Sequence, residues 1–284
     1  ILVKNTRLGK LYIVSTPIGN LKDISQRSLD ALKEADFCLV EDTRVTKKLL
    51  NHYQIQTKNR LISYHKFSEK KKLKDIILKL SSGKDLALVS DAGTPLISDP
   101  GSLLVREVVS LGSEIVVCPG PSAVITALTV SGFNLDKFSF YGFSPSKDSE
   151  REEFFKILGS KNETVIFFET SRNLAKTLSS LNKIMPTREL CICREMTKLY
   201  ESYYRGISSE LIEMMKINEN MVKGEIAIVL SDLEEKKIKK ESLSLEEIRI
   251  VEMISEFLPK KEASKLAAKM FKRSKKDFYD FLSK

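Results

Sequence analysis

The sequence predicts an α/β protein made of two α/β domains and a small helical domain at the carboxyl-terminal end. Short runs of apolar residues alternate with helix-like stretches as far as Leu230, which is typical of sheets covered by helices. Turns rich in Pro and Gly directly follow many of these runs. Beyond a charged segment at 231–243, apolar residues recur only at helical spacing. We therefore expect an N-terminal α/β domain at 10–120, a C-terminal α/β domain at 121–233 and a basic helical domain at 234–284.

The first domain contains five apolar runs that predict short buried strands. They are Leu11–Val14, Phe37–Val40, Leu61–Tyr64, Leu86–Ser90 and Glu114–Cys118. Between them we expect helices that end near Lys33, Asn51, Leu80 and Leu111. Asp23 followed by Gln26 resembles a capping box that begins the first of these helices. The repeated strand–helix order predicts a mostly parallel sheet.

In the second domain the pattern starts again after Phe133. Strands are expected at Phe138–Gly142, Thr164–Phe168, Glu189–Cys193, Tyr200–Arg205 and Glu225–Leu230, and a helix at Asn173–Ile184. The run Tyr200–Arg205 alternates poorly, which suits an edge strand. We expect this second sheet to be more mixed than the first.

The last domain is predicted to contain three short helices. Ile248, Val251, Ile254 and Leu258 share one helical face until Pro259 ends the helix. An amphipathic stripe follows, made of Ala263, Leu266, Ala267, Met270 and Phe271. Ser274 with Asp277 then caps a helix that carries Phe278, Phe281 and Leu282. Three such helices can form a bundle whose second and third members resemble a helix–turn–helix.

Composition excludes several classes of protein. Hydrophobic residues make up 42% and charged residues 30%, which fits a folded domain rather than a disordered chain. No apolar run approaches the ~20 residues of a membrane-spanning helix, and the first residues lack the pattern of a secretory signal. Cys38, Cys118, Cys191 and Cys193 are expected to be reduced core thiols, and with two histidines no metal site is expected. We expect a cytoplasmic protein.

The positive charge is concentrated near the end of the chain. The net charge is +9, and residues 260–276 hold eight Lys or Arg against one Glu. Such a cluster favours contacts with the phosphates of a nucleic acid, although a solvated helix face has the same composition. The candidate RNA-binding residues are Lys260, Lys261, Lys265, Lys269, Lys272, Arg273, Lys275 and Lys276.

Four loops that follow predicted strands are rich in polar residues or in Gly and Pro, and three of them contain both Gly and Pro. They lie at 16–20, 41–44, 90–95 and 119–123. In a parallel sheet, ligands bind beyond the carboxyl ends of the strands, where these loops meet. Neither G-x-G-x-x-G nor a P-loop motif is present, so the loops suit a small ligand without a phosphate chain.

These loops also carry a family resemblance. The strings T-P-I-G-N-L-x-D-I-S (16–25), E-D-T-R (41–44), S-D-A-G-T-P-L-I-S-D-P-G (90–101) and P-G-P-S-A (119–123) resemble the ribosomal RNA small-subunit methyltransferase I family of the tetrapyrrole methylase superfamily. The resemblance continues through F-F-E-T (167–170), R-E-M-T-K (194–198) and K-G-E-I-A-I-V-L (223–230). It implies two α/β domains that bind the methyl donor S-adenosylmethionine in the cleft between them. It also implies a homodimer that methylates a cytidine ribose 2′-hydroxyl in the 16S rRNA of the 30S subunit.

The same resemblance implies a set of donor-binding residues. Asp91 is expected to accept a hydrogen bond from the donor's ammonium group. The helix that begins after Ser122 is expected to hold the donor's carboxylate at its amino terminus. Phe168 and Glu169 would flank the adenosine. The full set is Pro17, Asp91, Ala92, Gly93, Ile97, Ser98, Ser122, Ala123, Phe168, Glu169, Ile226 and Ala227.

The catalytic group stays open at this point. A ribose hydroxyl is a weak nucleophile, so a base or a nearby charge should assist its attack on the methyl group. The candidates are Asp42, Arg44, His65 and Glu169. The family pattern typically places a histidine shortly after this glutamate, whereas this chain has Arg172 there.

Two other functions remain alternatives. The same fold methylates tetrapyrrole intermediates, and a noncatalytic RNA-binding assembly factor could keep the fold without the chemistry. The basic helical tail and the E-D-T-R loop favour the rRNA methyltransferase.

Overall fold

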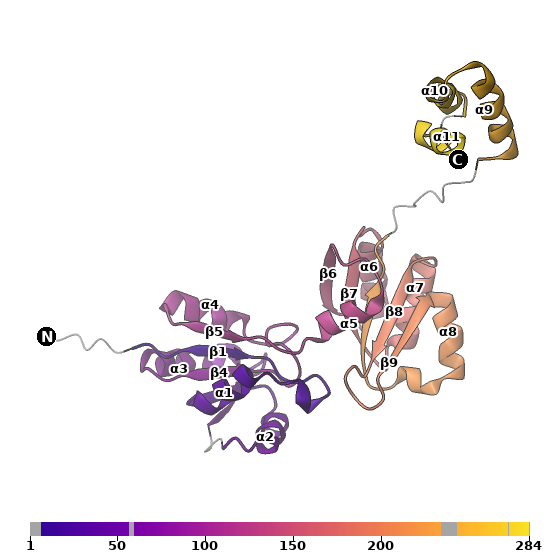
Figure 1. The fold of residues 1–284 in the computed structure, drawn as a ribbon. Coiled ribbons are helices and arrows are strands. Elements are labelled where there is room, and N and C mark those ends of the chain that lie inside the picture. Colours follow the sequence, from indigo (N-terminus) through magenta and orange to yellow (C-terminus); the bar gives the residue numbers. More distant parts are fainter. Residues whose placement is uncertain (1–6, 57–59, 234–242, 272, 284) are drawn as a thin grey trace. The chain divides into compact units, whose positions relative to one another are not determined.

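The computed structural model describes residues 7–56, 60–233, 243–271 and 273–283. The chain divides into two compact units, Ile1–Asp232 and Leu233–Lys284, called here the α/β unit and the helical unit. The described residues of the α/β unit form two five-stranded sheets, as the sequence predicts (Figure 1). The finer division into three domains at residues 120 and 233 stays a prediction.

The first sheet is entirely parallel. It contains β1 (Leu11–Val14), β2 (Phe37–Val40), β3 (Leu61–Ser63), β4 (Leu86–Val89) and β5 (Ile115–Cys118). Their order is β3-β2-β4-β1-β5, so the loops after β4, β1 and β5 are neighbours at one edge of the sheet. This order decides which of the predicted loops can meet.

Helices cover both faces of this sheet. The helices are α1 (Gln26–Glu34), α2 (Thr43–His52), α3 (Glu69–Ser81) and α4 (Ser102–Leu111). Side chains alternate along the strands: Val14, Val40 and Val89 pack with α1 and α2, whereas Ile13, Leu39 and Leu88 pack with α3 and α4. Burial on both faces explains why these strands are continuous apolar runs.

The start of α1 differs from the prediction. The N-cap is Ser25, whose hydroxyl accepts a hydrogen bond from the Ser28 amide at 3.1 Å. Asp23 belongs instead to a short 3-10 turn, Leu21–Asp23, that precedes the helix. The predicted Asp23–Gln26 capping box is therefore wrong, because the serine two residues later satisfies the helix amide.

The second sheet is mixed. It contains β6 (Phe138–Phe143), β7 (Thr164–Thr170), β8 (Glu189–Arg194), β9 (Ser202–Ile207) and β10 (Glu225–Leu230). In the order β6-β7-β10-β8-β9, only β6 and β7 are parallel. The predicted edge position of the Tyr200–Arg205 run is confirmed by β9.

One helix covers one face of the second sheet and three cover the other. The apolar α5 (Ala123–Ser131) packs on Ile166, Cys193 and Ala227. The opposite face packs against α6 (Asp148–Gly159), α7 (Leu174–Ile184) and α8 (Ser208–Ile217). Of these helices, α6 and α8 were not predicted from the sequence. All four cysteines are buried free thiols, which confirms their expected place in the core.

A buried arginine fastens the end of the α/β unit. The guanidinium of Arg188 donates hydrogen bonds to three carbonyl oxygens, those of Ser231 at 2.7 Å, Leu158 at 2.8 Å and Glu163 at 2.9 Å. Its burial lowers its pKa to about 10. Because Ser231 directly follows β10, Arg188 ties the last strand of the unit to α6 and to the segment before β7.

The helical unit contains α9 (Leu245–Phe257), α10 (Lys260–Phe271) and α11 (Lys275–Leu282). Val251, Ala267 and Phe278 form its core. Ser244 and Glu247 form a capping box at the start of α9. Leu266 and Met270 are 42% and 54% exposed, so the predicted α10 stripe is only partly buried. Among the described helices, none has the length and hydropathy needed to cross a bilayer.

Candidate functional site

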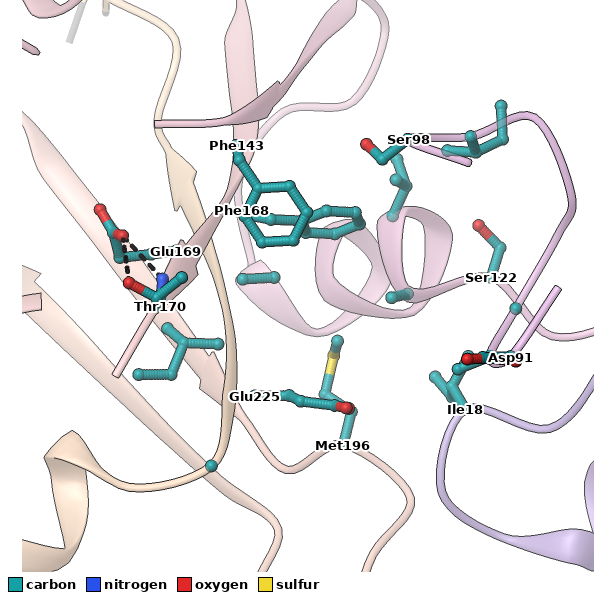
Figure 2. A pocket seen from close by; sticks show the side chains of 18 of the residues that line it. Ile18, Asp91, Ser98, Ser122, Phe143, Phe168, Glu169, Thr170, Met196 and Glu225 are labelled. Carbon is teal, nitrogen blue, oxygen red and sulfur yellow. Dashed lines mark hydrogen bonds between the residues drawn. The ribbon is translucent and has the colours of Figure 1, made fainter. Parts of the chain in front are cut away.

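A cavity of about 470 Å³ lies in the α/β unit where loops of the first sheet face loops and strands of the second (Figure 2). The first sheet contributes the loops after β1, β4 and β5. The second contributes β7, the start of β10 and the loop after β8. Its lining residues are Ile18, Asp91, Ala92, Gly93, Thr94, Ile97, Ser98, Asp99, Ser122, Ala123, Val124, Phe143, Phe168, Glu169, Thr170, Ser171, Arg172, Met196, Gly224, Glu225, Ile226 and Ala227.

Hydrogen bonds join the three first-sheet loops. Thr16 and Gly93 form an isolated antiparallel bridge, with N–O distances of 2.9 and 3.0 Å. Gly93 has a φ of +87°, a conformation that favours glycine at this point of the bridge. The Thr94 hydroxyl donates to the Pro121 carbonyl at 3.1 Å, which ties the β4 loop to the β5 loop. The three loops therefore form one rigid wall.

Backbone strain gathers around the cavity. Five described non-glycine residues have positive φ, and four of them lie in two loops at the cavity: Leu96 and Ser98 after β4, and Glu195 and Thr197 after β8. Left-handed backbone costs a non-glycine residue of the order of 1 kcal/mol or more and persists only where its surroundings hold it. Such clustering is typical of ligand sites.

Gly19 allows the two sides of the site to approach each other. A Cβ atom at this position would lie 2.4 Å from Lys198 Cγ, 2.6 Å from Thr197 Oγ1 and 2.7 Å from the Met196 carbonyl oxygen. Any larger residue would have to push the β1 loop away from the loop after β8. The absence of a side chain at Gly19 therefore allows the loop after β1 to lie close to the loop after β8 at this side of the cavity.

One end of the cavity is acidic. Burial raises the pKa of Asp99 to about 6, and the neighbouring carboxylates of Glu41 and Asp91 act in the same direction. Burial is also the first cause of the raised pKa values of Asp91 and Glu41. Three close carboxylates that repel one another favour a cationic ligand, because a positive charge relieves this repulsion.

The cavity also contains a pair of aromatic rings and, near Asp91, the amino terminus of a helix (Figure 2). Phe143 and Phe168 meet edge to face with ring centroids 5.4 Å apart, and both line the cavity (Figure 2). Ser122 caps α5, and its hydroxyl accepts from the Ile125 amide at 3.5 Å. The amides of the first turn of α5 therefore lie at the cavity, where they favour a negatively charged group.

Glu169 lines the cavity, but its carboxylate is engaged in hydrogen bonds with other residues of the protein. It accepts hydrogen bonds from the Thr170 amide at 2.6 Å and from the hydroxyls of Ser144 and Thr177. Along β7, Phe168 packs on the α5 side, so the next side chain points to the opposite face of the sheet. Figure 2 shows the carboxylate turned toward Thr170. The structure therefore does not support Glu169 as a catalytic base.

The predicted donor-binding residues come together, with one exception. All of them line the cavity except Pro17, whose place is taken by its neighbour Ile18. Because Thr16 is held in the bridge to Gly93, Ile18 is the side chain of this loop that lies at the cavity. Sequence reasoning missed Asp99, Phe143 and Met196, and it named Arg172 only as the residue that stands where the family pattern has a histidine. Asp99 lies within the longest sequence string that resembles the family, and Phe143 directly follows a predicted strand. Both residues could therefore have been identified from the sequence as candidates for the cavity.

Three of the four catalytic candidates lie outside the lining. Asp42 caps α2 and binds Arg44 through both carboxylate oxygens, which holds its pKa at about 2 and makes it a weak base. Arg44 is engaged in that pair, although it is 86% exposed. His65 lies near Glu41, where it opposes the rise in the pKa of that carboxyl, but it is not part of the wall. These residues follow β2 and β3, whose loops do not line the cavity, although β2 is the direct neighbour of β4 in the sheet.

The basic tail has two kinds of residue. Lys260, Lys261, Lys265, Lys269, Lys275 and Lys276 are exposed on α10 and α11. Arg273 is instead bonded to Glu247 at 2.9 Å with 18% of its side chain exposed, so it has a structural role. Lys272 lies outside the described residues. Within the described ranges, no three His, Cys, Asp or Glu side chains are arranged to hold a metal ion.

Comparisons with solved structures agree with this fold. A diphthine synthase superimposes with a TM-score of 0.60 at 16% identity, over 78% of this chain and 90% of that one. A uroporphyrin-III C-methyltransferase from Thermus thermophilus, complexed with S-adenyl homocysteine, superimposes with a TM-score of 0.54 at 15% identity, over 78% and 97%. At such identities the likeness concerns the fold alone.

Sequence comparisons define the family more closely. The family model described as Tetrapyrrole (Corrin/Porphyrin) Methylases matches residues 10–212. A Bacillus subtilis protein named ribosomal RNA small subunit methyltransferase I is 39% identical over 96% of this chain and 94% of its own length. A Thermotoga maritima protein of the same name is 46% identical over 80% of this chain and 100% of its own length. The chain therefore belongs to the tetrapyrrole methylase family and, within it, to the ribosomal RNA small subunit methyltransferase I proteins.

Proposed function

We propose that this protein transfers a methyl group from S-adenosylmethionine to the 2′-hydroxyl of a cytidine ribose in the 16S rRNA of the small ribosomal subunit. The observation that carries the proposal is the polarity of the cavity, which is acidic at one end and has an aromatic pair and a helix amino terminus elsewhere. The name shared by the relatives supports rRNA of the small subunit as the substrate.

The cavity fits the methyl donor by charge and by shape. S-adenosylmethionine supplies a methyl group bound to a positively charged sulfur and also carries an ammonium, a carboxylate and an adenosine. Asp91 would hold the ammonium group, and the amides at the start of α5 would hold the carboxylate. Phe143 and Phe168 would bind the adenine between apolar surfaces. The S-adenyl homocysteine named for the Thermus structure supports this assignment.

We propose Asp99 as the group that assists the ribose hydroxyl. Its carboxylate lines the cavity, no described hydrogen bond occupies it, and its pKa of about 6 is closer to neutrality than that of an ordinary aspartate. A base with a pKa near the working pH accepts a proton efficiently while still being largely ionised. Asp99 therefore replaces Asp42, Arg44, His65 and Glu169 as the residue that takes the proton, and the rigid walls align the two reactants.

The exposed lysines of the helical unit would bind RNA phosphates. We also propose that the protein is a homodimer and that it acts in the cytoplasm, where its substrate is. The lysine density of α10 and α11 supports the first part, since phosphate contacts supply most nonspecific affinity for nucleic acids. The family resemblance supports the second. Light scattering on the full chain would give a mass twice 32.2 kDa if the protein is a dimer.

Methyl incorporation tests the proposed function directly. Purified 30S subunits that lack the modification are incubated with the full chain and a donor labelled in its methyl group, and the labelled ribose is mapped in the 16S rRNA. Label on a cytidine 2′-oxygen supports the proposal. Label on a porphyrinogen instead would indicate a tetrapyrrole methylase, and binding of 30S subunits without incorporation would indicate an assembly factor.

A further inference from the structure

The loop between β3 and α3 displays an aromatic side chain that the core does not use. Phe67 is 94% exposed, more than any other large hydrophobic side chain in the described part of the molecule. It lies four positions after Ser63, the last residue of β3, and therefore at the carboxyl edge of the first sheet. The loops of the donor cavity lie at this same edge.

The loop is rigid, so the exposure of Phe67 is not a consequence of a loose segment. The Ser68 and Glu69 amides both donate to the His65 carbonyl, at 2.8 and 3.0 Å. Glu69 accepts from the Tyr64 hydroxyl at 3.0 Å and from the Leu103 amide at 3.2 Å. These bonds tie the loop to the start of α4, which follows the Asp99 segment of the cavity wall. The backbone that carries the phenylalanine is therefore held in place.

The surroundings of the ring are basic. Lys66, Lys70 and Lys71 are exposed, and none of them has a described ion pair or hydrogen bond. The nearby carboxylate of Glu69 accepts hydrogen bonds from Tyr64 and Leu103 and has no described ion pair with these lysines. The exposed Glu41 interacts electrostatically with Asp91 and His65, and it has no described ion pair with these lysines. An exposed aromatic ring among unpaired lysines is the composition of single-stranded RNA sites.

The position of the ring relative to the cavity also fits RNA. Strand β3 is separated from β4 only by β2, so the loops after β3 and β4 are about 10 Å apart across the sheet. His65 contacts Phe67 edge to face, with ring centroids 6.3 Å apart, and also influences Glu41 beside Asp91 and Asp99. A nucleotide on Phe67 would thus belong to the same RNA segment as the nucleotide at the cavity.

We propose that Phe67, with Lys66, Lys70 and Lys71, forms a second RNA-binding surface, on which a base flanking the methylated nucleotide stacks while the lysines contact its phosphates. The proposal rests on the proposed function for the identity of the RNA.

The absence of tryptophan from the chain offers a direct probe. Phe67→Trp keeps an aromatic platform and introduces a single indole, whose fluorescence a stacked base quenches. We titrate full-length Phe67→Trp protein with a single-stranded oligocytidylate about ten nucleotides long, within the range of known single-strand sites. Saturable quenching that weakens with added salt supports the proposal. RNA binding detected by anisotropy of a labelled oligonucleotide, without any change in the indole fluorescence, would overturn it.

Truncation of the ring gives the second measurement. Phe67→Ala should weaken oligonucleotide binding about tenfold and raise KM for 30S subunits with little change in kcat. The control is Ile217→Ala, which removes an 88% exposed apolar side chain of α8 beside Lys216 and should leave both values unchanged. Equal binding by the two variants would overturn the proposal.

The same variants separate this proposal from the proposed function. If the wild-type chain methylates no 30S subunit, the proposed function fails, while the indole titration still decides whether the surface binds RNA. If Phe67→Ala loses 30S methylation but binds oligocytidylate like the wild type, the ring contacts a ribosomal protein and the RNA surface is disproved. Calorimetry with S-adenosylhomocysteine should show the same donor affinity in Phe67→Ala and the wild type.

Discussion

The backbone amide of Asp42 donates a hydrogen bond to Oδ1 of Asp91 at 3.1 Å, which connects the carboxyl end of β2 with the wall of the cavity. The E-D-T-R loop thus acts on the site through its backbone rather than through the side chains that the sequence singled out. Asp91 in turn keeps its other oxygen free of described partners, at the end of the cavity where a cationic ligand fits.

Replacing Asp91 should separate these two roles. Asp91→Asn keeps an oxygen that accepts from the Asp42 amide but removes the negative charge. Because a hydrogen bond to a charged group contributes about 1.5–3 kcal/mol, we expect donor affinity to fall by about ten- to a hundredfold. Calorimetric titration with S-adenosylhomocysteine measures the change. Asp91→Ala, which also loses the bond to Asp42, should melt at a lower temperature than Asp91→Asn; identical donor affinity in Asp91→Asn and the wild type would contradict the assigned role.

The rate of methyl transfer should depend on the ionisation of Asp99. Since burial raises its pKa to about 6, the carboxylate that accepts the proton forms as the pH rises through 6. Single-turnover rates measured from about pH 5 to about pH 8, a range that brackets this pKa, should therefore increase and then level off. In Asp99→Asn the rate should be low and should lack this inflection. An inflection that persists in the variant would assign the proton transfer to another group.

Asp99 should also affect stability, with a predictable sign. Its pKa in the folded state is above the ordinary value of 3.8, so the folded protein binds this proton more tightly than the unfolded chain does. The contribution of Asp99 to stability is therefore greatest below about pH 4 and is lost as the pH rises through about 6. Asp99→Asn should consequently melt at a higher temperature than the wild type at about pH 7.5, and the difference should shrink as the pH is lowered to about 5. Differential scanning calorimetry can follow this change.

Gly19 should tolerate no side chain. In Gly19→Ala the new methyl group meets the Met196 carbonyl and the side chains of Thr197 and Lys198, and we expect an overpacking cost of about 1–3 kcal/mol. Donor affinity should fall as well, because the β1 loop and the loop after β8 both contribute to the cavity. Gly159→Ala is the matched control, since its Cβ would lie 3.5 Å from Met185 Cε in ordinary contact. Thermal unfolding and donor calorimetry on the two variants give the comparison.

The lysines of the helical unit should act through salt-dependent phosphate contacts. Replacing Lys265 and Lys269 on α10 by Gln should reduce the slope of log K against log salt by about 0.7 for each phosphate of a single strand that is no longer neutralised. Binding of a labelled 16S rRNA fragment at several salt concentrations provides the slope. Lys176→Gln removes an exposed lysine of α7 and should leave the slope unchanged. Equal slopes in all three proteins would show that α10 is merely a solvated face.

The strands could be predicted closely because each is a short apolar run between turns, and burial on two faces leaves little room for polar residues. Helix α6 escaped prediction because its apolar residues, Phe154, Phe155 and Leu158, follow an acidic stretch that has no helical stripe of its own. Helix α8 begins immediately after β9, at Ser208, so no turn marked the change of period.

The candidate site was predicted less completely because strand order is not visible in the sequence. The loops after β1, β4 and β5 meet because these strands are neighbours, whereas Asp42 and His65 follow strands that lie toward the other edge. The role of Glu169 was open to a simpler argument. Alternation along β7 sends its carboxylate away from the face that Phe168 shares with α5.

The hydrogen bond from Arg188 to the Ser231 carbonyl has a consequence for how such proteins can diversify. Because Arg188 holds the last strand before the chain passes on, exchange of the residues beyond Asp232 removes none of the residues that line the cavity. Under the proposed function, a foreign nucleic-acid-binding module joined at that junction should direct methyl transfer to a new RNA.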